Sequence, residues 1–124
     1  MGVYIKLGDL EIYKEALELS RNAWRVYKVL SWQQKKIIGD QFITSIDSVG
    51  ANIAEGYGRY HYKDRAKFYY NARGSLFESK NWALLLYERR IINKKDFDYF
   101  MNQTEKVNRI INSYIHACGK NITQ

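Results

Sequence analysis

The sequence predicts an all-α protein folded as an antiparallel up-down-up-down four-helix bundle, with residues 1–124 forming a single domain. One observation behind this prediction is that proline, which breaks helix interiors, is absent. Another is that apolar residues recur every three or four positions, as in an amphipathic helix, in four long segments: 9–30, 32–55, 62–91 and 94–118. The connections are short, so placing consecutive helices side by side is the simplest way to bury four apolar faces.

The first predicted helix, 9–30, has Asp9 at its N-cap position. Its expected core face consists of residues spaced by three and four: Tyr13, Ala16, Leu17, Ser20, Ala23, Trp24 and Tyr27. Ser31 and Gln34 then have the spacing of a capping box, in which the serine hydroxyl and the glutamine side chain each bond the other residue's backbone amide. This pattern predicts a tight turn directly into the second helix.

The second and fourth predicted helices each carry one apolar face. In the segment 32–55 that face consists of Ile38, Phe42, Ser45, Val49 and Ile53. Gly56 is expected to end this helix in the left-handed conformation, which glycine adopts without steric cost. Asn93 is expected to cap the fourth helix, 94–118. The face of the fourth helix consists of Phe97, Phe100, Thr104, Val107, Ile111, Tyr114 and Cys118.

The third predicted helix, 62–91, carries two apolar lines instead of one. The line assigned to the bundle core consists of Phe68, Ala72, Ser75, Leu76, Ser79, Ala83 and Leu86. The second line lies on nearly the opposite side and consists of Tyr70, Gly74, Phe77, Asn81 and Leu84. A surface helix needs only one apolar face, so the second line predicts self-association of the chain. The alternative is a central helix that packs on both sides within one bundle.

The net charge of +7 is concentrated in one part of the chain. Residues 59–95 contain ten basic and three acidic residues, and the rest of the chain is balanced. Localised positive charge of this kind suits a polyanionic partner such as nucleic acid. The alternative interpretation is an ordinary charged face that keeps the protein soluble.

Aromatic residues are interleaved with the cations at the start of the third helix. Cations neutralise phosphates, and aromatic rings stack on unpaired bases, so this mixture favours RNA over a DNA duplex. The candidate RNA-contact residues are Arg59, Tyr60, Tyr62, Lys63, Arg65, Lys67 and Arg73. Tyr57, His61, Phe68 and Tyr69 belong to the same aromatic set. The alternative is that the tyrosines pack in the core and the charges are merely solvated.

Few residues suggest catalysis or a cofactor. The chain has no P-loop and no Rossmann glycine pattern, and two histidines with one cysteine are too few for a structural zinc site. We therefore expect no metal and no cofactor. Cys118 lies on the expected face of the fourth helix, where it is interpreted as a small core residue. A single cysteine and the lack of a long apolar stretch predict a cytoplasmic protein without a membrane span.

One pair of residues gives an enzymatic alternative. Arg109 and His116 lie seven residues apart on one face of the fourth helix. The pair resembles the Arg-x(4–6)-His signature of the HEPN-domain ribonucleases, which are also helical bundles. Those enzymes usually have a polar residue after the arginine, whereas this chain has Ile110.

Two segments resemble a known family. Residues 52–59 read Asn-Ile-Ala-Glu-Gly-Tyr-Gly-Arg and resemble the NIAEG-x-x-R motif of four-helix-bundle proteins encoded in intervening sequences of bacterial 23S ribosomal RNA genes. Residues 72–78 resemble that family's A-x-G-S-L-x-E segment. Gln41 and Ser48 also match, whereas Thr44 replaces a frequent arginine and residues 48–51 replace a Ser-Ile-Pro-Ser run. The resemblance extends from about residue 10 to residue 114.

The resemblance implies a four-helix bundle that assembles as a ring, with a pentamer as the expected size. The sequence is also similar to the accessory protein of diversity-generating retroelements, a basic bundle that binds RNA and a reverse transcriptase. Nucleic-acid binding without catalysis is therefore the implied function, and an adaptor for a reverse transcriptase or another protein–RNA complex is the alternative. The family-motif residues interpreted as structural are Asn52, Glu55, Gly56, Ser75 and Glu78.

Overall fold

The computed structural model describes the backbone of residues 6–123 and the side chains of residues 6–121. Every regular element in this part of the chain is helical. The elements in chain order are η1 (Leu7–Asp9), α1 (Glu11–Tyr27), α2 (Trp32–Gln34), η2 (Lys35–Gly39), α3 (Asp40–Tyr57), α4 (Tyr62–Glu88) and α5 (Lys94–Thr123). The segment η2 is one π-helical turn that joins α2 to α3 without a break, because its flanking residues keep helical backbone angles.

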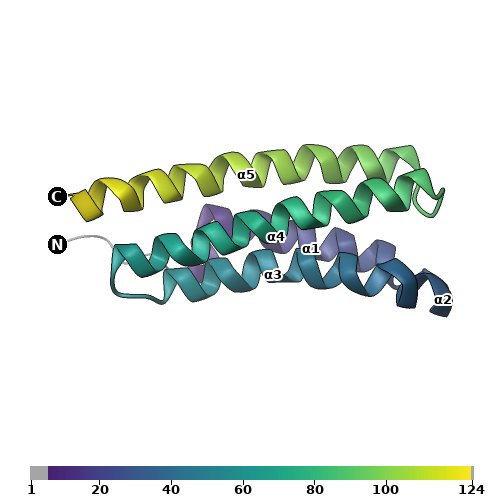
Figure 1. Ribbon diagram of the computed structural model, residues 1–124, viewed down its shortest axis with the longest axis horizontal. Helices are drawn as coiled ribbons and strands as arrows, with labels where there is room; N and C mark the ends of the chain where they lie inside the picture. Colours follow the sequence, from purple (N-terminus) through teal and green to yellow (C-terminus); the bar gives the residue numbers. More distant parts are fainter. Residues whose placement is uncertain (1–5, 124) are drawn as a thin grey trace.

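Four long helices pack around one core. Helix α1 contacts α3 and α5, and α4 also contacts α3 and α5, so each helix has two principal neighbours. Figure 1 shows the α3–α4 connection and the C-terminal end of α5 at one end of the molecule. The α1–α2 turn and the α4–α5 turn lie at the other end. None of the helices in the described part is long and apolar enough to cross a lipid bilayer.

The expected faces of the second and fourth helices form the centre of the core. All five residues of the predicted 32–55 face are buried, and so are five of the seven residues of the 94–118 face. Phe42 of α3 and Phe100 of α5 meet edge to face, with 5.2 Å between ring centroids. Cys118 is also buried, which agrees with its interpretation as a core residue.

The expected face of the first helix was partly wrong. The residues of α1 that are buried are Ile12, Ala16, Leu19, Ala23 and Val26. Trp24 is 54% exposed and stacks on Tyr27 at the surface, with 5.5 Å between ring centroids. The physical reason is that tryptophan and tyrosine tolerate a boundary position with the polar atom in water, whereas isoleucine and leucine gain only from burial.

Two of the three predicted caps are confirmed. Ser31 Oγ accepts a hydrogen bond from the Gln34 amide at 3.0 Å, and the Ser31 amide donates to Gln34 Oε1 at 2.9 Å. Asn93 Oδ1 accepts from the Asp96 amide at 2.8 Å. The cap assigned to Asp9 was wrong, because that residue lies in η1 and the N-cap of α1 is Leu10, which provides no side-chain bond.

The prediction that Gly56 ends α3 in a left-handed conformation was wrong. It lies inside α3, and no glycine in the described part has a positive φ. A Cβ atom at Gly56 would lie 3.0 Å from Phe68 Cβ and 3.2 Å from the Arg65 carbonyl oxygen. Glycine is required there because α4 begins in direct contact with α3. Helix propensity and turn signals alone do not reveal such a contact.

The α4 C-terminus predicts a stabilising substitution. Arg90 has φ 58°, a left-handed conformation that costs a residue with a Cβ about 1–2 kcal/mol. The bonds from the Arg90 amide to the Tyr87 carbonyl (3.0 Å) and from the Ile91 amide to the Leu86 carbonyl (2.9 Å) form a Schellman motif. Arg90→Gly is therefore expected to raise the free energy of unfolding by about 1 kcal/mol in urea denaturation. Arg89→Gly removes the same charge at φ −83° and should give no gain, and equal effects of the two would contradict the argument.

Candidate nucleic-acid interface

The predicted RNA-contact residues begin at the α3–α4 connection. Tyr60 is 87% exposed in this connection, and Tyr62 is 41% exposed at the first position of α4. Lys63 and Lys67 are also exposed, in the first and second turns of α4. The start of α4 therefore presents two aromatic rings and two ammonium groups to solvent.

The two arginines nearest the connection are held by local contacts. Arg59 Nη2 lies 2.6 Å from Glu55 Oε1, and its guanidinium lies 4.8 Å from the centroid of the Phe68 ring. Arg65 Nε donates to the Arg59 carbonyl oxygen at 2.6 Å. The Arg59–Glu55 pair is exposed on both sides, so it contributes little to stability and does not prevent Arg59 from meeting a phosphate.

Arg73 is not part of this cluster. It lies about 16 Å along α4 from the first residue of the helix, given the rise of 1.5 Å per residue. Its guanidinium lies 4.8 Å from the centroid of the Tyr70 ring, and Nη1 donates to Asn112 Oδ1 of α5 at 2.8 Å. Arg73 therefore belongs with the second apolar line.

Tyr69 does not lie on the surface with the other tyrosines. It is 4% exposed and meets Tyr114 of α5 edge to face, with 5.8 Å between ring centroids. Burial raises the pKa of Tyr69 to about 12. Cys118 is also buried, and burial raises the pKa of its thiol, which therefore stays protonated at neutral pH. The aromatic residues of the segment thus divide into a buried and an exposed group, which sequence spacing did not distinguish.

The second line of α4 is exposed along its whole length in the single chain. Tyr70 is 49%, Phe77 53% and Leu84 42% exposed, and Gly74 and Asn81 between them are also exposed. Lys63 and Lys67 continue the line toward the start of the helix, since they precede Tyr70 by seven and three positions. The cations and the apolar line therefore form one ridge, which we call the α4 ridge.

The family-motif residues lie on both sides of the α3–α4 connection. Asn52 Nδ2 donates to the Ser48 carbonyl within α3 at 2.8 Å, and Glu55 pairs with Arg59 as described above. On α4, Ser75 is half-buried and Glu78 is exposed. Among these residues the structure explains the identity of Gly56 most directly, because a residue with a Cβ atom at this position would crowd the start of α4.

The two residues of the ribonuclease alternative do not share the groove that His116 lines. Arg109 and His116 are both exposed on α5. His116 lines a groove between α4 and α5 together with Tyr70 and Asn112, whereas Arg109 does not line it. Within the described residues no group of three or more His, Cys, Asp or Glu side chains is arranged to hold a metal ion.

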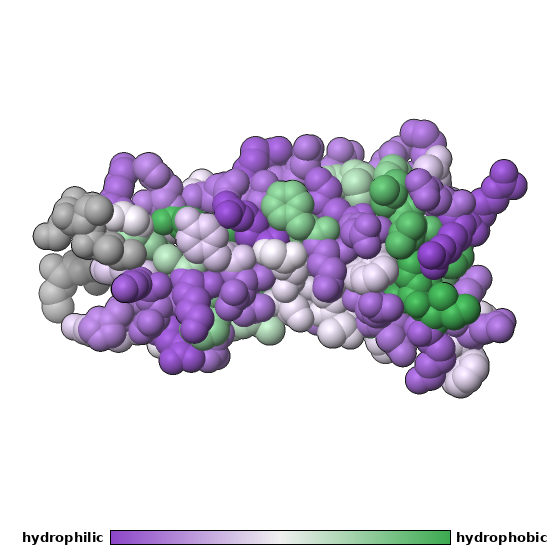
Figure 2. Space-filling view, viewed as in Figure 1, coloured by the Kyte–Doolittle hydropathy of each residue, from purple (hydrophilic) through white to green (hydrophobic). Residues whose placement is uncertain are grey.

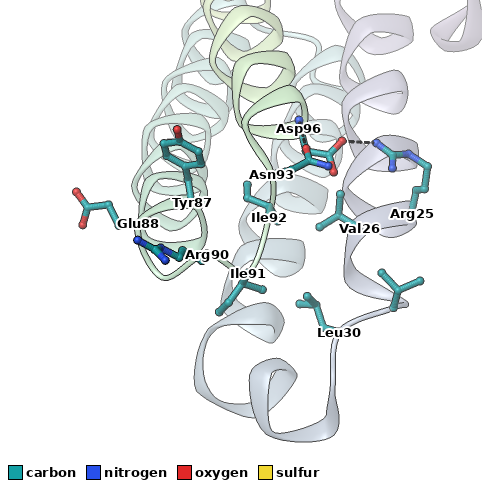
Figure 3. Close-up of a pocket in the computed structure, with 11 residues that line it drawn as sticks. Arg25, Val26, Leu30, Tyr87, Glu88, Arg90, Ile91, Ile92, Asn93 and Asp96 are labelled. Atoms are coloured by element: carbon teal, nitrogen blue, oxygen red, sulfur yellow. Dashed lines mark hydrogen bonds and ion pairs between the residues drawn. The ribbon is translucent and has the colours of Figure 1, made fainter.

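Sequence reasoning missed a pocket at the opposite end of the molecule. It has a volume of about 670 Å³ and lies between the C-terminal end of α1 and the α4–α5 turn. Figure 3 shows Val26, Leu30, Ile91 and Ile92 beside the ion pair of Arg25 with Asp96, whose atoms are 2.9 Å apart. The exposed large hydrophobic residues in this part of the chain are Val29, Trp32 and Ile37. Figure 2 shows an apolar patch at this end, and the apolar pairs at residues 29–30 and 91–92 are a sequence signal for it.

Comparison with known proteins identifies the family. The family model for the 23S rRNA-intervening sequence protein matches residues 8–113. The chain belongs to this family. The match includes both segments that carried the resemblance in sequence, and it also includes the start of α4 and the whole α4 ridge.

A solved relative of the family has the same fold. It is the crystal structure of a protein of unknown function from the S23 ribosomal protein family of Bacteroides thetaiotaomicron. It is 23% identical, covers 84% of this chain and 97% of its own, and superposes with a TM-score of 0.78. At this identity the likeness shows the fold alone. No curated protein matches the chain.

Proposed function

We propose that this family member is a non-catalytic, cytoplasmic RNA-binding protein whose up-down-up-down bundles assemble as a ring, with a pentamer as the expected size. The observation that carries the proposal is the α4 ridge. One end of it presents Lys63 and Lys67 beside exposed tyrosines, and the rest presents an apolar line. Cations with aromatic rings suit the phosphates and unpaired bases of RNA. An exposed apolar line on an otherwise polar helix suits a second copy of the chain.

Assembly and binding support each other in this proposal. Copies that meet along the apolar line of the α4 ridge also bring together the lysines at its end. A cluster of cations from neighbouring copies raises the local positive potential above that of a single chain. In this proposal the α4 ridge gives a role to the second apolar line and to two of the cations in the basic segment, Lys63 and Lys67.

Salt dependence of RNA binding tests the proposal. Fluorescence polarisation with a labelled single-stranded RNA should give an affinity that falls steeply as salt rises, because phosphate contacts release counterions. Replacing Arg59, Lys63 and Lys67 by alanine should reduce the slope of log K against log salt by about 2, at roughly 0.7 per lost contact. An unchanged slope would show that these residues are not the contacts.

The matched control removes three cations from the opposite end. Arg89, Lys94 and Lys95 are exposed near the α4–α5 turn, and their replacement by alanine changes the net charge by the same amount. This control should retain most of the slope. Equal losses in the two triple variants would mean that net charge alone determines the binding.

A specific observation favours a second candidate function, an adaptor for a protein–RNA complex such as one containing a reverse transcriptase. The pocket beside the α4–α5 turn and the exposed Val29, Trp32 and Ile37 lie at the end opposite the α3–α4 connection, where a protein partner could bind without competing for RNA. Failure of the wild-type chain to bind RNA by itself, with binding restored by a purified reverse transcriptase, would favour the adaptor.

A further inference from the structure

A second pocket lies at the same end of α4 as Lys63 and Lys67, and Tyr62 and Arg65 of that end are among the residues that line it. It has a volume of about 330 Å³ and is formed between the first half of α4 and the last half of α5, with Leu10 and Tyr57 at its side. This volume is at the lower end of the range for small-molecule sites, about 300–1,000 Å³. Its lining is mainly aromatic and apolar, with few polar groups. We call it the tyrosine pocket.

The aromatic walls of the tyrosine pocket are held in place. Tyr69 is 4% exposed and packs edge to face against Tyr114. Tyr114 of α5 packs against the core and lines the pocket together with Tyr69. Since these rings are fixed before anything binds, a planar ligand would bind without first ordering them.

Polar groups at the pocket provide the means of recognition. The Arg65 guanidinium lies 5.2 Å from the centroid of the Tyr62 ring, and the bond from Nε to the Arg59 carbonyl fixes its position. Its terminal N–H groups have no hydrogen-bond partner among the described residues. The Tyr69 hydroxyl also has no partner within the described part, and burial keeps it protonated, so it can donate as well as accept.

We propose that the tyrosine pocket holds one unpaired base of an RNA strand whose phosphates lie along Lys63 and Lys67. Planar rings around a small apolar pocket fit a flat aromatic ligand, and a guanidinium at its edge can stack on a base or donate to it. The lysines supply the charge complementarity for the phosphates on either side of that base. This inference rests on the proposed RNA binding and adds to it the part of the RNA that is recognised.

The first experiment compares an oligoadenylate with an abasic ribose-phosphate strand of equal length. The wild-type chain should bind the oligoadenylate about ten-fold more tightly, since stacking of one base on aromatic side chains has an effect of this size. Both strands should give the same salt slope, because their phosphates are identical. Equal affinities for the two strands would overturn the pocket while leaving RNA binding intact. Failure to bind either strand would remove both proposals.

The second experiment fills the pocket from its exposed rim. Ser113 lines the pocket, and within the described residues its hydroxyl donates a hydrogen bond to the Arg109 carbonyl of its own helix, so Ser113→Trp breaks no side-chain hydrogen bond between helices there. This variant should lose the ten-fold preference for the oligoadenylate and keep the salt slope. The control Asn102→Trp places the same side chain at an exposed position of α5 outside the pocket and should keep both. Loss of the preference in both variants, or in neither, would overturn the proposal.

Two further measurements do not depend on filling the pocket. Arg65→Lys retains the charge but loses the planar guanidinium, so it should reduce the preference for bases and leave the salt slope unchanged.

A photo-crosslink from RNA containing 4-thiouridine, mapped by mass spectrometry, should fall on peptides that contain Tyr62 or Tyr114. Crosslinks confined to the opposite end of the molecule would exclude the tyrosine pocket as the base site.

Discussion

Replacing Phe77 by aspartate is expected to convert the assembled protein into single chains of 14.7 kDa that remain helical. Phe77 lies at the middle of the apolar line and is 53% exposed in the single chain, so the substitution removes little from the bundle core. In an assembly through the α4 ridge, the aspartate would have to be buried without a partner, which costs several kcal/mol per copy. Light scattering coupled to size exclusion measures the mass, and circular dichroism measures the helix content.

The control for this prediction is Trp24→Asp. Trp24 is 54% exposed on α1, so it matches Phe77 in exposure and in aromatic character but lies away from the α4 ridge. This variant should retain the mass of the wild-type assembly. A wild-type protein that runs as a single chain at every concentration would refute the ring, and dissociation by Trp24→Asp alone would place the interface on α1.

Substituting alanine for Gly56 and for Gly50 is expected to change stability in opposite directions, although both residues are buried in α3. At Gly50 the new Cβ would lie 3.8 Å from Ala16 Cβ, an ordinary contact, so the better helix propensity of alanine should add about 1 kcal/mol. At Gly56 the new Cβ would lie 3.0 to 3.2 Å from three atoms of α4. Gly56→Ala should therefore lose about 1–3 kcal/mol, the usual cost of overpacking.

The loss at Gly56 follows from what its neighbours can do. The three atoms are Phe68 Cβ, a ring carbon of Tyr69 and the Arg65 carbonyl oxygen, and the Tyr69 ring is itself held against Tyr114. None is the free end of a flexible side chain, so the start of α4 must move as a unit. Urea denaturation of the two variants measures the signs. A gain at Gly56 equal to that at Gly50 would show that α4 adjusts without cost.

The sequence by itself determined the number of long helices, their approximate positions and most of the core. The faces of α3 and α5 were predicted correctly because strongly apolar residues repeat there at helical spacing. The caps at Ser31 and Asn93 were found because a cap is a local bond between residues three apart. The motif at residues 52–59 pointed correctly to the family.

Only the tertiary structure decided the roles of several tyrosines, of Trp24 and of Gly56. Tyr62 and Tyr69 belong to one tyrosine-rich segment, yet the first is exposed and the second is buried against α5. Trp24 lies on the surface of α1, and Gly56 is an approach point between two helices rather than a turn. The physical reason is that periodicity defines a face only to within one residue, and an amphipathic side chain is stable on either side of that boundary. Contacts between helices far apart in sequence make the choice, and they also form both pockets.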